Sequence, residues 1–326
     1  MKDSTHAEQA IAIERQDFGR KPRRSPGEWW GIQWRGMKRN KVSYLFLLPF
    51  FLIFFTFTLL PVLMSMVLSF TSFNVLERPN FVGMLNYINL LLDDDIFLIS
   101  VKNTFLFAAI TGPIGYMAAL IFAIMINELP PKFRAVMTVV YYAPTISGQA
   151  FIIWRTLFSG DAYGYANGLL MRLGLIDQPV QWLTDPEYMQ GVLIVVVLWM
   201  SLGTGFLSFV AGLQAVDQTL YEAGMVDGIS NRFQEIWFIT LPSIKPQLMF
   251  GAVMSITSSF GIHDILVPLA GFPSTDYAAH TVVSHLVDYG NIRFEMGYAS
   301  AIATILFIVM MSSNIIIQRL LGKVGN

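Results

Sequence analysis

The sequence has no cysteine among its 326 residues, so disulfide bonds, thiol nucleophiles and cysteine-based metal sites are excluded. Charge is scarce as well, because Asp, Glu, Lys and Arg make up 13% of the chain, roughly half of their share in soluble domains. The net charge is −1, and no basic stretch is interleaved with aromatic residues. Nothing in the sequence therefore indicates a nucleic acid partner.

Motifs for nucleotide binding and catalysis are missing too. No Gly-x4-Gly-Lys-Ser/Thr loop is present, since Gly322–Lys323 is followed by valine, and Gly-x-Ser-x-Gly and His-Glu-x2-His are also absent. His280 and His285 are five residues apart, which does not place them on one helical face. We expect them to be ordinary surface residues rather than metal ligands. The sequence thus predicts no enzyme activity, no metal and no cofactor bound by this chain.

Long apolar segments are what the sequence has in abundance. Hydrophobic residues make up 54% of the chain, and the mean hydropathy is +0.55. A helix needs about 20 apolar residues to cross a bilayer. Six segments reach this length, at roughly 43–70, 103–126, 136–158, 189–213, 247–270 and 296–320. The sequence therefore predicts an all-α integral membrane protein with six transmembrane helices.

Basic residues are distributed unevenly between the connecting segments. With the N-terminus placed in the cytoplasm, sixteen of the 21 Lys and Arg fall on the cytoplasmic side. Because cytoplasmic loops carry the excess of Lys and Arg, we expect both termini in the cytoplasm. This divides the chain into an N-terminal tail over 1–41, a six-helix domain over 42–321 and a C-terminal tail over 322–326.

The N-terminal tail carries ten of the 21 basic residues. Trp30, Trp34 and Met37 are spaced to share one face of a helix, which favours a short interfacial helix on anionic lipid. A disordered basic tail is an equal alternative for residues 1–26. A signal peptide is not expected, because the basic and apolar stretches are too long and no small-x-small cleavage site follows.

Two loops on the non-cytoplasmic side, residues 81–87 and 161–182, contain aromatic residues, glycines and turn-forming residues. They predict small ordered elements that are too short to form a separate domain.

One polar, charged stretch interrupts the second half of the chain, at about residues 217–246. It predicts two short helices on the cytoplasmic side, the first begun by a capping box of Thr219 and Glu222. Gly228 can take the left-handed conformation that closes this helix. Ser230 or Asn231 can cap the second helix, and Pro242 is expected to end it.

Hydroxyl groups are concentrated in two of the apolar segments. Ser201, Thr204 and Ser208 lie in one, and Ser255, Ser258 and Ser259 lie in another. With a neighbouring methionine they would suit a neutral, hydroxyl-rich ligand such as a sugar. The alternative is that small and hydroxylated residues let the helices pack closely, and the pattern alone favours that alternative.

The polar stretch resembles the EAA loop of ABC importer permeases, in which Glu-Ala-Ala is followed by three residues, Gly, nine residues and Ile-x-Leu-Pro. The matching residues are Glu222-Ala223-Gly224, Gly228 and Ile239-Thr240-Leu241-Pro242. The resemblance covers nearly all of residues 40–322, through segments such as Phe81-Val82-Gly83, Asn103-Thr104, Ile153-Trp154-Arg155 and Gly297–Ala301. Together these segments look like the larger, MalF-type permease subunit of carbohydrate importers.

This resemblance implies a role and a set of partners. The hairpin would be the coupling element that docks on an ATPase subunit, through Glu222, Ala223, Gly224, Asp227, Gly228, Leu241 and Pro242. The other subunits would be a second homologous permease, two cytoplasmic ATPases that bind ATP and Mg, and an extracytoplasmic solute-binding protein. The cargo would be a carbohydrate, preferably an oligosaccharide, and the location the bacterial cytoplasmic (inner) membrane.

Two departures from the family pattern concern the hairpin. Gly224 stands where alanine is usual, which exchanges one small residue for another and should preserve close docking. Ten residues rather than nine separate Gly228 from Ile239, so an extra residue is expected in the turn or in the second helix.

The same resemblance suggests a substrate path, formed by Val197, Met200, Ser201, Thr204, Ser255 and Ser259. Most of these residues belong to the hydroxyl-bearing segments found from composition alone. Val197 departs from the maltose system, where an amide at this position can bind sugar, and this puts an equivalent sugar site in doubt.

Two other functions are less well supported by the sequence. A polyol phosphate such as glycerol phosphate would need a cationic cavity, and only Arg155 lies near one. An ion-coupled secondary carrier would need an acid at mid-depth in a span, and none is visible.

Overall fold

The computed structural model describes residues 41–322 of the chain. The chain divides into two compact units, Met1–Leu63 and Met64–Asn326. The tail helix expected around Trp30, Trp34 and Met37 lies outside the described residues.

The described part of the first unit is helical. It contains α3 (Lys41–Phe54), the π turn η1 (Phe55–Leu59) and the start of α4 (Leu60–Leu68), which continues into the second unit. The π turn directly precedes Leu60 and Pro61. A proline ring clashes with the carbonyl four residues earlier and lacks an N–H, and a π turn is one of the ways in which a helix accommodates such a site.

The second unit consists of helices joined by short connections. Its elements are α5 (Leu85–Leu92), α6 (Asp95–Asn127), α7 (Pro131–Ser147), α8 (Ile152–Leu157), α9 (Tyr165–Arg172), α10 (Pro186–Met200), α11 (Thr204–Gln214), α12 (Gln218–Val226), α13 (Arg232–Glu235), η2 (Ile236–Thr240), α14 (Leu241–Ser243), α15 (Lys245–Phe260), α16 (His263–Ala270), η3 (Thr275–Tyr277), α17 (Val282–Val287), η4 (Asp288–Ile292) and α18 (Met296–Leu321). Between residues 41 and 322 the extended backbone is limited to one isolated bridge, Thr71 with Phe81. The predicted all-α membrane fold is therefore confirmed.

Five segments of the described chain are long and apolar enough to cross a membrane: Lys41–Leu68, Asp95–Asn127, Pro186–Gln214, Lys245–Ala270 and Met296–Leu321. The expected span over 136–158 is instead divided. Its first part is the 17-residue α7, and its second part is the six-residue α8. Gly148, at φ +65°, ends α7 in the left-handed conformation that glycine adopts without strain. The count of six spans thus stays a prediction.

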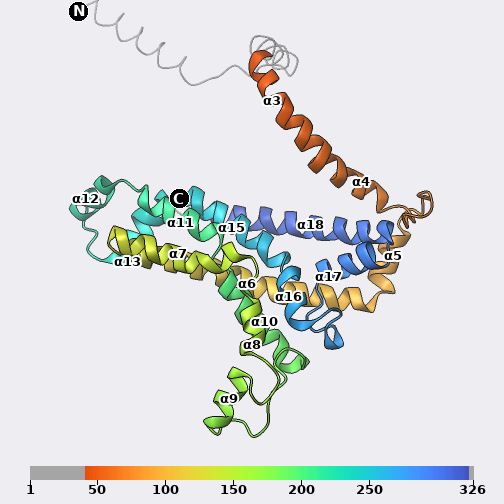
Figure 1. Cartoon of the computed structure of the whole chain (residues 1–326). Helices are drawn as coiled ribbons and strands as arrows, with labels where there is room; N and C mark the ends of the chain where they lie inside the picture. Colours follow the sequence, from red (N-terminus) through yellow and green to blue (C-terminus); the bar gives the residue numbers. More distant parts are fainter. Residues whose placement is uncertain (1–40, 323–326) are drawn as a thin grey trace, which may run out of the picture. The chain divides into compact units, whose positions relative to one another are not determined.

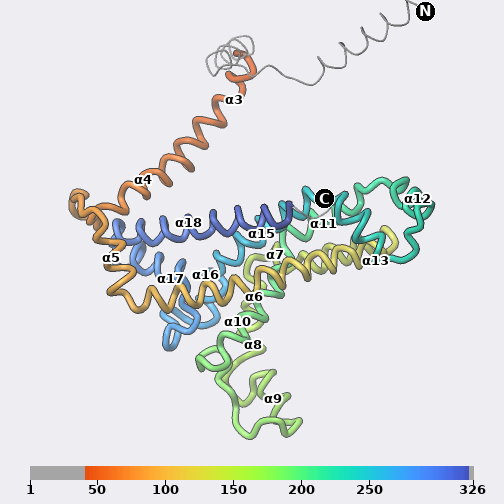
Figure 2. Tube along the Cα trace, turned by 180° about the vertical axis from the view of Figure 1, so that it is seen from behind, coloured from red at the N-terminus to blue at the C-terminus, as the bar shows by residue number. Residues whose placement is uncertain are grey.

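Helix α6 is the central element of the second unit. It contributes buried residues to three apolar clusters, with Phe107 beside α10, Ala123 beside α11, and Phe97 beside α17 and α18. In both views of the chain, α6, α15 and α18 run side by side (Figures 1 and 2). At one end of these helices lie α12 and α13, here called the hairpin end, and at the other lie α5 and α17, here called the far end (Figure 1).

Both predicted loop elements are ordered by a buried asparagine. The Nδ2 of Asn86 donates to the carbonyl oxygens of Ser69 and Thr71, at 2.8 and 2.9 Å. Asn167 in α9 is fully buried, and its amide donates to three carbonyls while its Oδ1 accepts from the indole of Trp182. Each amide bonds loop carbonyls that would otherwise lack a backbone donor.

Candidate functional site

The first helix of the hairpin, α12, begins two residues earlier than the capping-box pattern predicted. Asp217 is its N-cap, and the Asp217 Oδ1 accepts a hydrogen bond from the Thr219 N–H at 3.0 Å. This bond holds the pKa of Asp217 below its usual range. The capping box of Thr219 and Glu222 was therefore wrong, because an aspartate two residues earlier already satisfies the first free N–H group.

The turn and the start of the second helix follow the prediction. Gly228 has φ +94°, a conformation that L side chains rarely adopt. Asn231 caps α13, since its Oδ1 accepts from the Gln234 N–H at 2.9 Å. In return, the N–H of Ser230 donates to the Gln234 side chain at 3.0 Å. The start of the second helix is thus fixed from both sides.

The second helix does not end at Pro242. It continues through η2 and α14, and it breaks at Ile244, where ψ is 16°. In η2 the N–H of Leu241 bonds to the carbonyl of Ile236, five residues back. Such a π turn holds one residue more than an α-helical turn. The extra residue between Gly228 and Ile239 therefore lies in the second helix, and the helix passes Pro242 because the wider turn directly precedes it.

Gly224 faces the inside of the hairpin. A Cβ at this position would lie 2.6 Å from the Cδ1 of Ile239 and 3.1 Å from the Cδ1 of Ile229. The small residue therefore allows the two hairpin helices to approach each other, and it is buried rather than presented outward. Sequence reasoning connected Gly224 with docking on a partner, whereas in this chain its small size serves packing within the hairpin.

The outward surface of the hairpin is formed by other residues. Among the predicted coupling residues, Glu222, Ala223 and Asp227 are exposed, whereas Leu241 and Pro242 are half-buried in the second helix. Large apolar side chains surround them, and Val226 is 88% exposed. The other exposed apolar residues are Leu220, Met225, Phe233, Trp237 and Phe238. We call these six apolar residues, together with Glu222, Ala223 and Asp227, the hairpin surface; exposed apolar groups at this density are typical of a binding surface.

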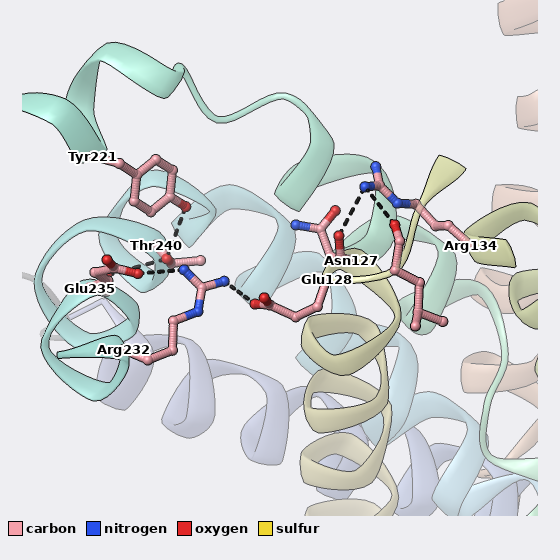
Figure 3. A network of polar contacts seen from close by, with 8 residues as sticks. Asn127, Glu128, Arg134, Tyr221, Arg232, Glu235 and Thr240 are labelled. Carbon is pink, nitrogen blue, oxygen red and sulfur yellow. Dashed lines mark hydrogen bonds and ion pairs between the residues drawn. The ribbon is translucent and has the colours of Figure 1, made fainter. Parts of the chain in front are cut away.

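A charged contact joins the hairpin to the end of α6 (Figure 3). The guanidinium of Arg232 pairs with Glu235, with Nη1 and Oε2 2.5 Å apart, and with Glu128, which directly follows α6. Burial alone would lower the pKa of Arg232, but the two carboxylates outweigh it and raise that pKa. Arg232 therefore stays fully charged between its two partners.

A polar cavity of about 390 Å³ lies beside this contact. It is lined by Asn127, Glu128, Arg134, Leu213, Gln214, Gln218, Tyr221, Arg232 and Glu235. Across it, the hydroxyl of Tyr221 in α12 lies 3.0 Å from the Oγ1 of Thr240 in η2 (Figure 3). Sequence reasoning missed Glu128, Arg134 and Arg232 as a group, because nothing local connects the α6–α7 turn with the hairpin.

A smaller cavity of about 150 Å³ lies where α10 ends and α11 begins. Four of the predicted path residues line it: Met200, Ser201, Thr204 and Ser255. The chain is broken at this point, and the Oγ1 of Thr145 donates to the carbonyls of Met200 and Leu202, at 3.3 and 3.1 Å. Inside a membrane, carbonyls released at a helix break need such donors.

The other two predicted path residues lie elsewhere. Val197 is buried among the apolar residues of α10 and α16. Ser259 lines a separate, mainly apolar cavity of about 350 Å³ beside α18, which Ser255 also lines. Three of the hydroxyls bond within the protein. Ser201 donates to the Leu198 carbonyl at 2.6 Å, Ser255 to the Gly112 carbonyl at 2.9 Å and Ser259 to the Ser255 carbonyl at 2.6 Å. Both interpretations of the hydroxyls thus have support, as helix packing around Ser259 and as cavity lining around Ser201 and Thr204.

The far end contains a buried polar cluster that the sequence did not reveal. The Oδ2 of Asp94, the N-cap residue of α6, accepts from His285 Nε2 and from the Tyr298 hydroxyl, both at 2.9 Å. Burial would raise the pKa of Asp94, but the Phe97 N–H, Tyr298 and His285 outweigh it and hold that pKa below its usual range. The ring of His280 lies 5.6 Å from that of His285.

His280 and His285 are therefore not surface residues, and that expectation was wrong. Their side chains are buried, at 3% and 1% exposed, because loop 271–281 folds back over the N-terminal half of α6. Burial and the neighbouring His285 lower the pKa of His280 to about 4. Within the described chain, no group of three or more His, Asp or Glu is arranged to hold a metal ion.

The far end also has an open cavity of about 900 Å³. Its lining includes the acids Glu77, Asp93, Asp94, Asp95 and Glu295, with Arg293 and two tyrosines. The acidic run from Asp93 to Asp95 was visible in the sequence, but an N-cap and a surface charge look alike there. Only the folded chain separates Asp94, whose carboxylate accepts hydrogen bonds from Phe97, His285 and Tyr298, from its exposed neighbours.

Comparisons with known proteins identify relatives of the whole chain. A family model described as "Binding-protein-dependent transport system inner membrane component" matches residues 132–324. A probable ABC transporter permease of Bacillus subtilis, YesP, is 32% identical over 84% of this chain and 88% of its own length. The arabinooligosaccharides transport system permease AraP of the same organism is 30% identical over 89% and 92%. The trehalose/maltose permease MalF of Thermococcus litoralis is 30% identical over 86% and 93%.

Two solved structures have the same fold. One is a bacterial ABC transporter involved in the import of the acidic polysaccharide alginate, with a TM-score of 0.68 over 88% of this chain and 98% of its own. The other is the alginate transporter in complex with a periplasmic protein bound to alginate pentasaccharide, with a TM-score of 0.70 over 90% and 99%. Both are 24% identical to this chain.

Proposed function

The chain belongs to the family of binding-protein-dependent transport system inner membrane components, and from this premise we propose that it is the permease subunit of an ATP-driven carbohydrate importer. Three relatives support a carbohydrate cargo, because they are named for the transport of arabinooligosaccharides, of lactose, and of trehalose and maltose. An oligosaccharide is preferred among these. A second, homologous permease would complete the path, in the cytoplasmic membrane of a bacterium.

The hairpin surface is the observation on which the coupling role rests. It combines exposed apolar side chains with Glu222 and Asp227 on a helix that is capped at one end and closed by a glycine at the other. A rigid, apolar, acidic surface suits insertion into a basic cleft of a partner. We infer that this partner is an ATPase subunit, and that each transporter has two such subunits, which bind ATP and Mg. The hairpin is then cytoplasmic, and a solute-binding protein delivers cargo at the far end.

The cavity at the α10–α11 break supports a neutral cargo. Its lining contains hydroxyls, glycines, methionines and aromatic rings, and no charged side chain among the described residues. Sugars are bound by such combinations of hydroxyl and apolar groups. A polyol phosphate would need a cation at this place, and the lining supplies none.

The coupling role can be tested by reversing one charge. In the complete transporter, Glu222→Lys should abolish sugar uptake and uptake-linked ATP hydrolysis, because an exposed acid would be replaced by a cation facing a basic cleft. Glu187→Lys is the matched control, since Glu187 is an exposed glutamate at the opposite end of the span Pro186–Gln214. Both variants should reach the membrane in normal amounts. Normal uptake by Glu222→Lys would overturn the coupling role.

The cargo can be tested with a panel of radiolabelled arabino-oligosaccharides, maltose, trehalose and lactose. Uptake of at least one should depend on ATP, and Thr204→Val should raise its KM by roughly fivefold, the equivalent of about 1 kcal/mol for one lost hydrogen bond. Thr257→Val is the control, because Thr257 is exposed on α15 and lies outside both mid-chain cavities. ATP-dependent uptake of glycerol phosphate but of no sugar would refute the carbohydrate cargo.

A further inference from the structure

The hairpin has two kinds of connection to the spans. Its chain runs directly into α15 at Ile244, where the second helix breaks. It also touches the end of α6 through Arg232, whose guanidinium lies between Glu235 and Glu128 (Figure 3). Glu128 is 104 residues away from Arg232 in the sequence, so this contact exists only in the folded chain.

Arg232 is held in place by the backbone around it. It is the first residue of α13, directly after the Asn231 cap. A cation there faces the positive end of the helix dipole, which is unfavourable by itself. The carboxylates of Glu128 and Glu235 compensate for that position, and they come from different segments of the chain.

Glu128 is presented by a turn that is equally well fixed. Arg134, near the start of α7, donates from Nη2 to the carbonyls of Asn127 at 2.9 Å and Leu129 at 3.2 Å (Figure 3). These carbonyls flank Glu128 on both sides. A guanidinium at the C-terminal end of α6 also interacts favourably with the helix dipole. The α6–α7 turn therefore offers Glu128 from a fixed backbone.

The two helices of the hairpin are linked to each other by side-chain contacts. They are joined by the hydroxyl contact of Tyr221 with Thr240, at 3.0 Å, and by the close approach of Gly224 to Ile239. The Thr240 hydroxyl also donates to the Glu235 carbonyl at 3.2 Å. The two hairpin helices are thus linked by side-chain contacts as well as by the chain through Gly228.

Helix α6 is suited to carry a displacement of the hairpin onward. Its 33 residues extend over about 50 Å, at about 1.5 Å per residue, with Pro113 inside the helix. At its other end, the N-cap Asp94 is bound by His285 and Tyr298 of the far-end cluster. The same helix is therefore held by charged or polar contacts at both ends.

We propose that Glu128 and Arg232 are positioning residues for coupling, and that their ion pair makes α6 move together with the hairpin. The hairpin then drives the spans by two routes, covalently through α15 and ionically through α6. This inference rests on the proposed coupling function. Because exposed ion pairs add little to stability, the loss of this pair reduces coupling while leaving the folded protein intact.

A charge-reversal cycle in the complete transporter tests the proposal. ATP hydrolysis is measured with Mg-ATP and with the binding protein loaded with the panel sugar that the transporter takes up. Glu128→Arg and Arg232→Glu should each lower the stimulated rate by about tenfold, because each places like charges together. The double variant should recover to within about threefold of the unmodified rate, because the pair is re-formed with its signs exchanged.

Two controls belong to this cycle. Glu187→Arg and Arg172→Glu reverse exposed charges away from the hairpin and should leave the stimulated rate unchanged. Glu128→Gln keeps the shape and loses the charge, so its rate should fall between those of the unmodified chain and Glu128→Arg. The proposal would be overturned if Glu128→Arg and Arg232→Glu had the same stimulated rate as these controls. It would also be overturned if the double variant were no faster than the slower of the two single variants.

A covalent version guards against variants that fail to fold. The chain has no cysteine, so Glu128→Cys with Arg232→Cys provides the two thiols of this chain for a short bis-maleimide linker. Before linking, the double-cysteine variant should have a reduced stimulated rate. Linking should raise this rate to within about threefold of that of the unmodified chain, because α6 and the hairpin would again move together. A transporter that is arrested by the linker would show that the contact has to open during the cycle, and the proposal would be wrong.

The outcome of Glu222→Lys separates this inference from the proposed function. If Glu222→Lys uncouples the transporter and Glu128→Arg does not, the hairpin couples without the ionic route to α6. If Glu222→Lys has no effect either, the coupling role itself fails.

Discussion

The hairpin end and the far end of this chain differ in how far their functional groups are exposed to solvent. At the hairpin end, apolar residues such as Val226 and Phe233 stay exposed, and the ion pair of Arg232 with Glu128 lies about half open to solvent. At the far end, Asp94, His280 and His285 are enclosed, and the carboxylate is satisfied from within the chain. The difference supports the proposal that a partner completes the hairpin end, whereas the far-end cluster is completed by the fold itself. Substitutions should therefore change coupling at one end and stability at the other.

The largest effect on stability is expected for Asp94→Ala. It leaves His285 Nε2, the Tyr298 hydroxyl and the Phe97 N–H without their acceptor, which should cost about 4 kcal/mol in total. Thermal unfolding of the purified protein in detergent measures this change. Asp95→Ala is the control, an exposed neighbour in the first turn of α6, with an expected loss below about 1 kcal/mol. Equal losses for the two variants would mean that the cluster is not held by Asp94.

The next effect concerns pH, through His280. Its pKa is about 4 in the folded chain, below the value of 6.5 in an unfolded one. The unfolded chain therefore binds more protons between these values, and stability should fall by about 3 kcal/mol as the pH decreases from 6.5 to 4. The groups that act on this ring are His285, His263, Asp94 and Asp288.

The variant His280→Phe removes that titration and keeps the stack on Phe272. The unfolding midpoint of this variant should depend less on pH between 6.5 and 4 than that of the unmodified protein. A slope remains from His285, whose pKa burial also lowers despite the neighbouring Asp94. If the two proteins have identical slopes over this range, His280 does not titrate in the folded state.

Gly224 tests a buried position of the hairpin, at the contact between its two helices. Gly224→Leu should destabilise the hairpin by about 2 kcal/mol through overpacking, because the new side chain meets Ile239 and Ile229. Gly224→Ala should be mild, since only the flexible ends of Ile239 and Ile229 have to move, and Ile239→Ala should relieve Gly224→Leu. Limited proteolysis at the hairpin measures its opening. Equal cleavage of Gly224→Leu with and without Ile239→Ala would contradict this packing.

The smallest effect on stability is expected on the hairpin surface. Val226→Ser and Phe233→Ser should change the free energy of unfolding by no more than about 0.5 kcal/mol, because both side chains are largely exposed. They should nevertheless lower sugar-linked ATP hydrolysis in the complete transporter, since a partner would cover them. A clear loss of stability with normal coupling would break the contrast between the two ends.

Much of the hairpin could be predicted from the sequence, because its geometry depends on local interactions. Gly228 and Asn231 take the conformations expected of them, and the extra residue before Ile239 is present as a π turn. The capping box failed since Asp217, two residues before Thr219, competes for the same N–H group. The expected single span over 136–158 is interrupted at Gly148, because hydropathy does not register a glycine in the left-handed conformation.

The predicted coupling residues and the predicted path residues differ in how far the sequence indicated their surroundings. The sequence identified Glu222, Ala223 and Asp227 by their pattern, and the folded chain exposes all three. Among the path residues, it could not tell Val197, which packs in a core, from Thr204, which lines a cavity. Both lie within the span Pro186–Gln214, and the direction of a side chain within a membrane helix depends on which neighbours surround it.

The sequence alone determined that this chain is a helical membrane protein with a polar hairpin, since the length of an apolar run and the identity of a cap are properties of neighbouring residues. Only the tertiary structure decided that His285 meets Asp94 across 191 residues and that Arg232 meets Glu128 across 104. The physical reason is that such pairs form only after the apolar helices have packed, with α6 at their centre, and no local pattern records which charges this packing brings together.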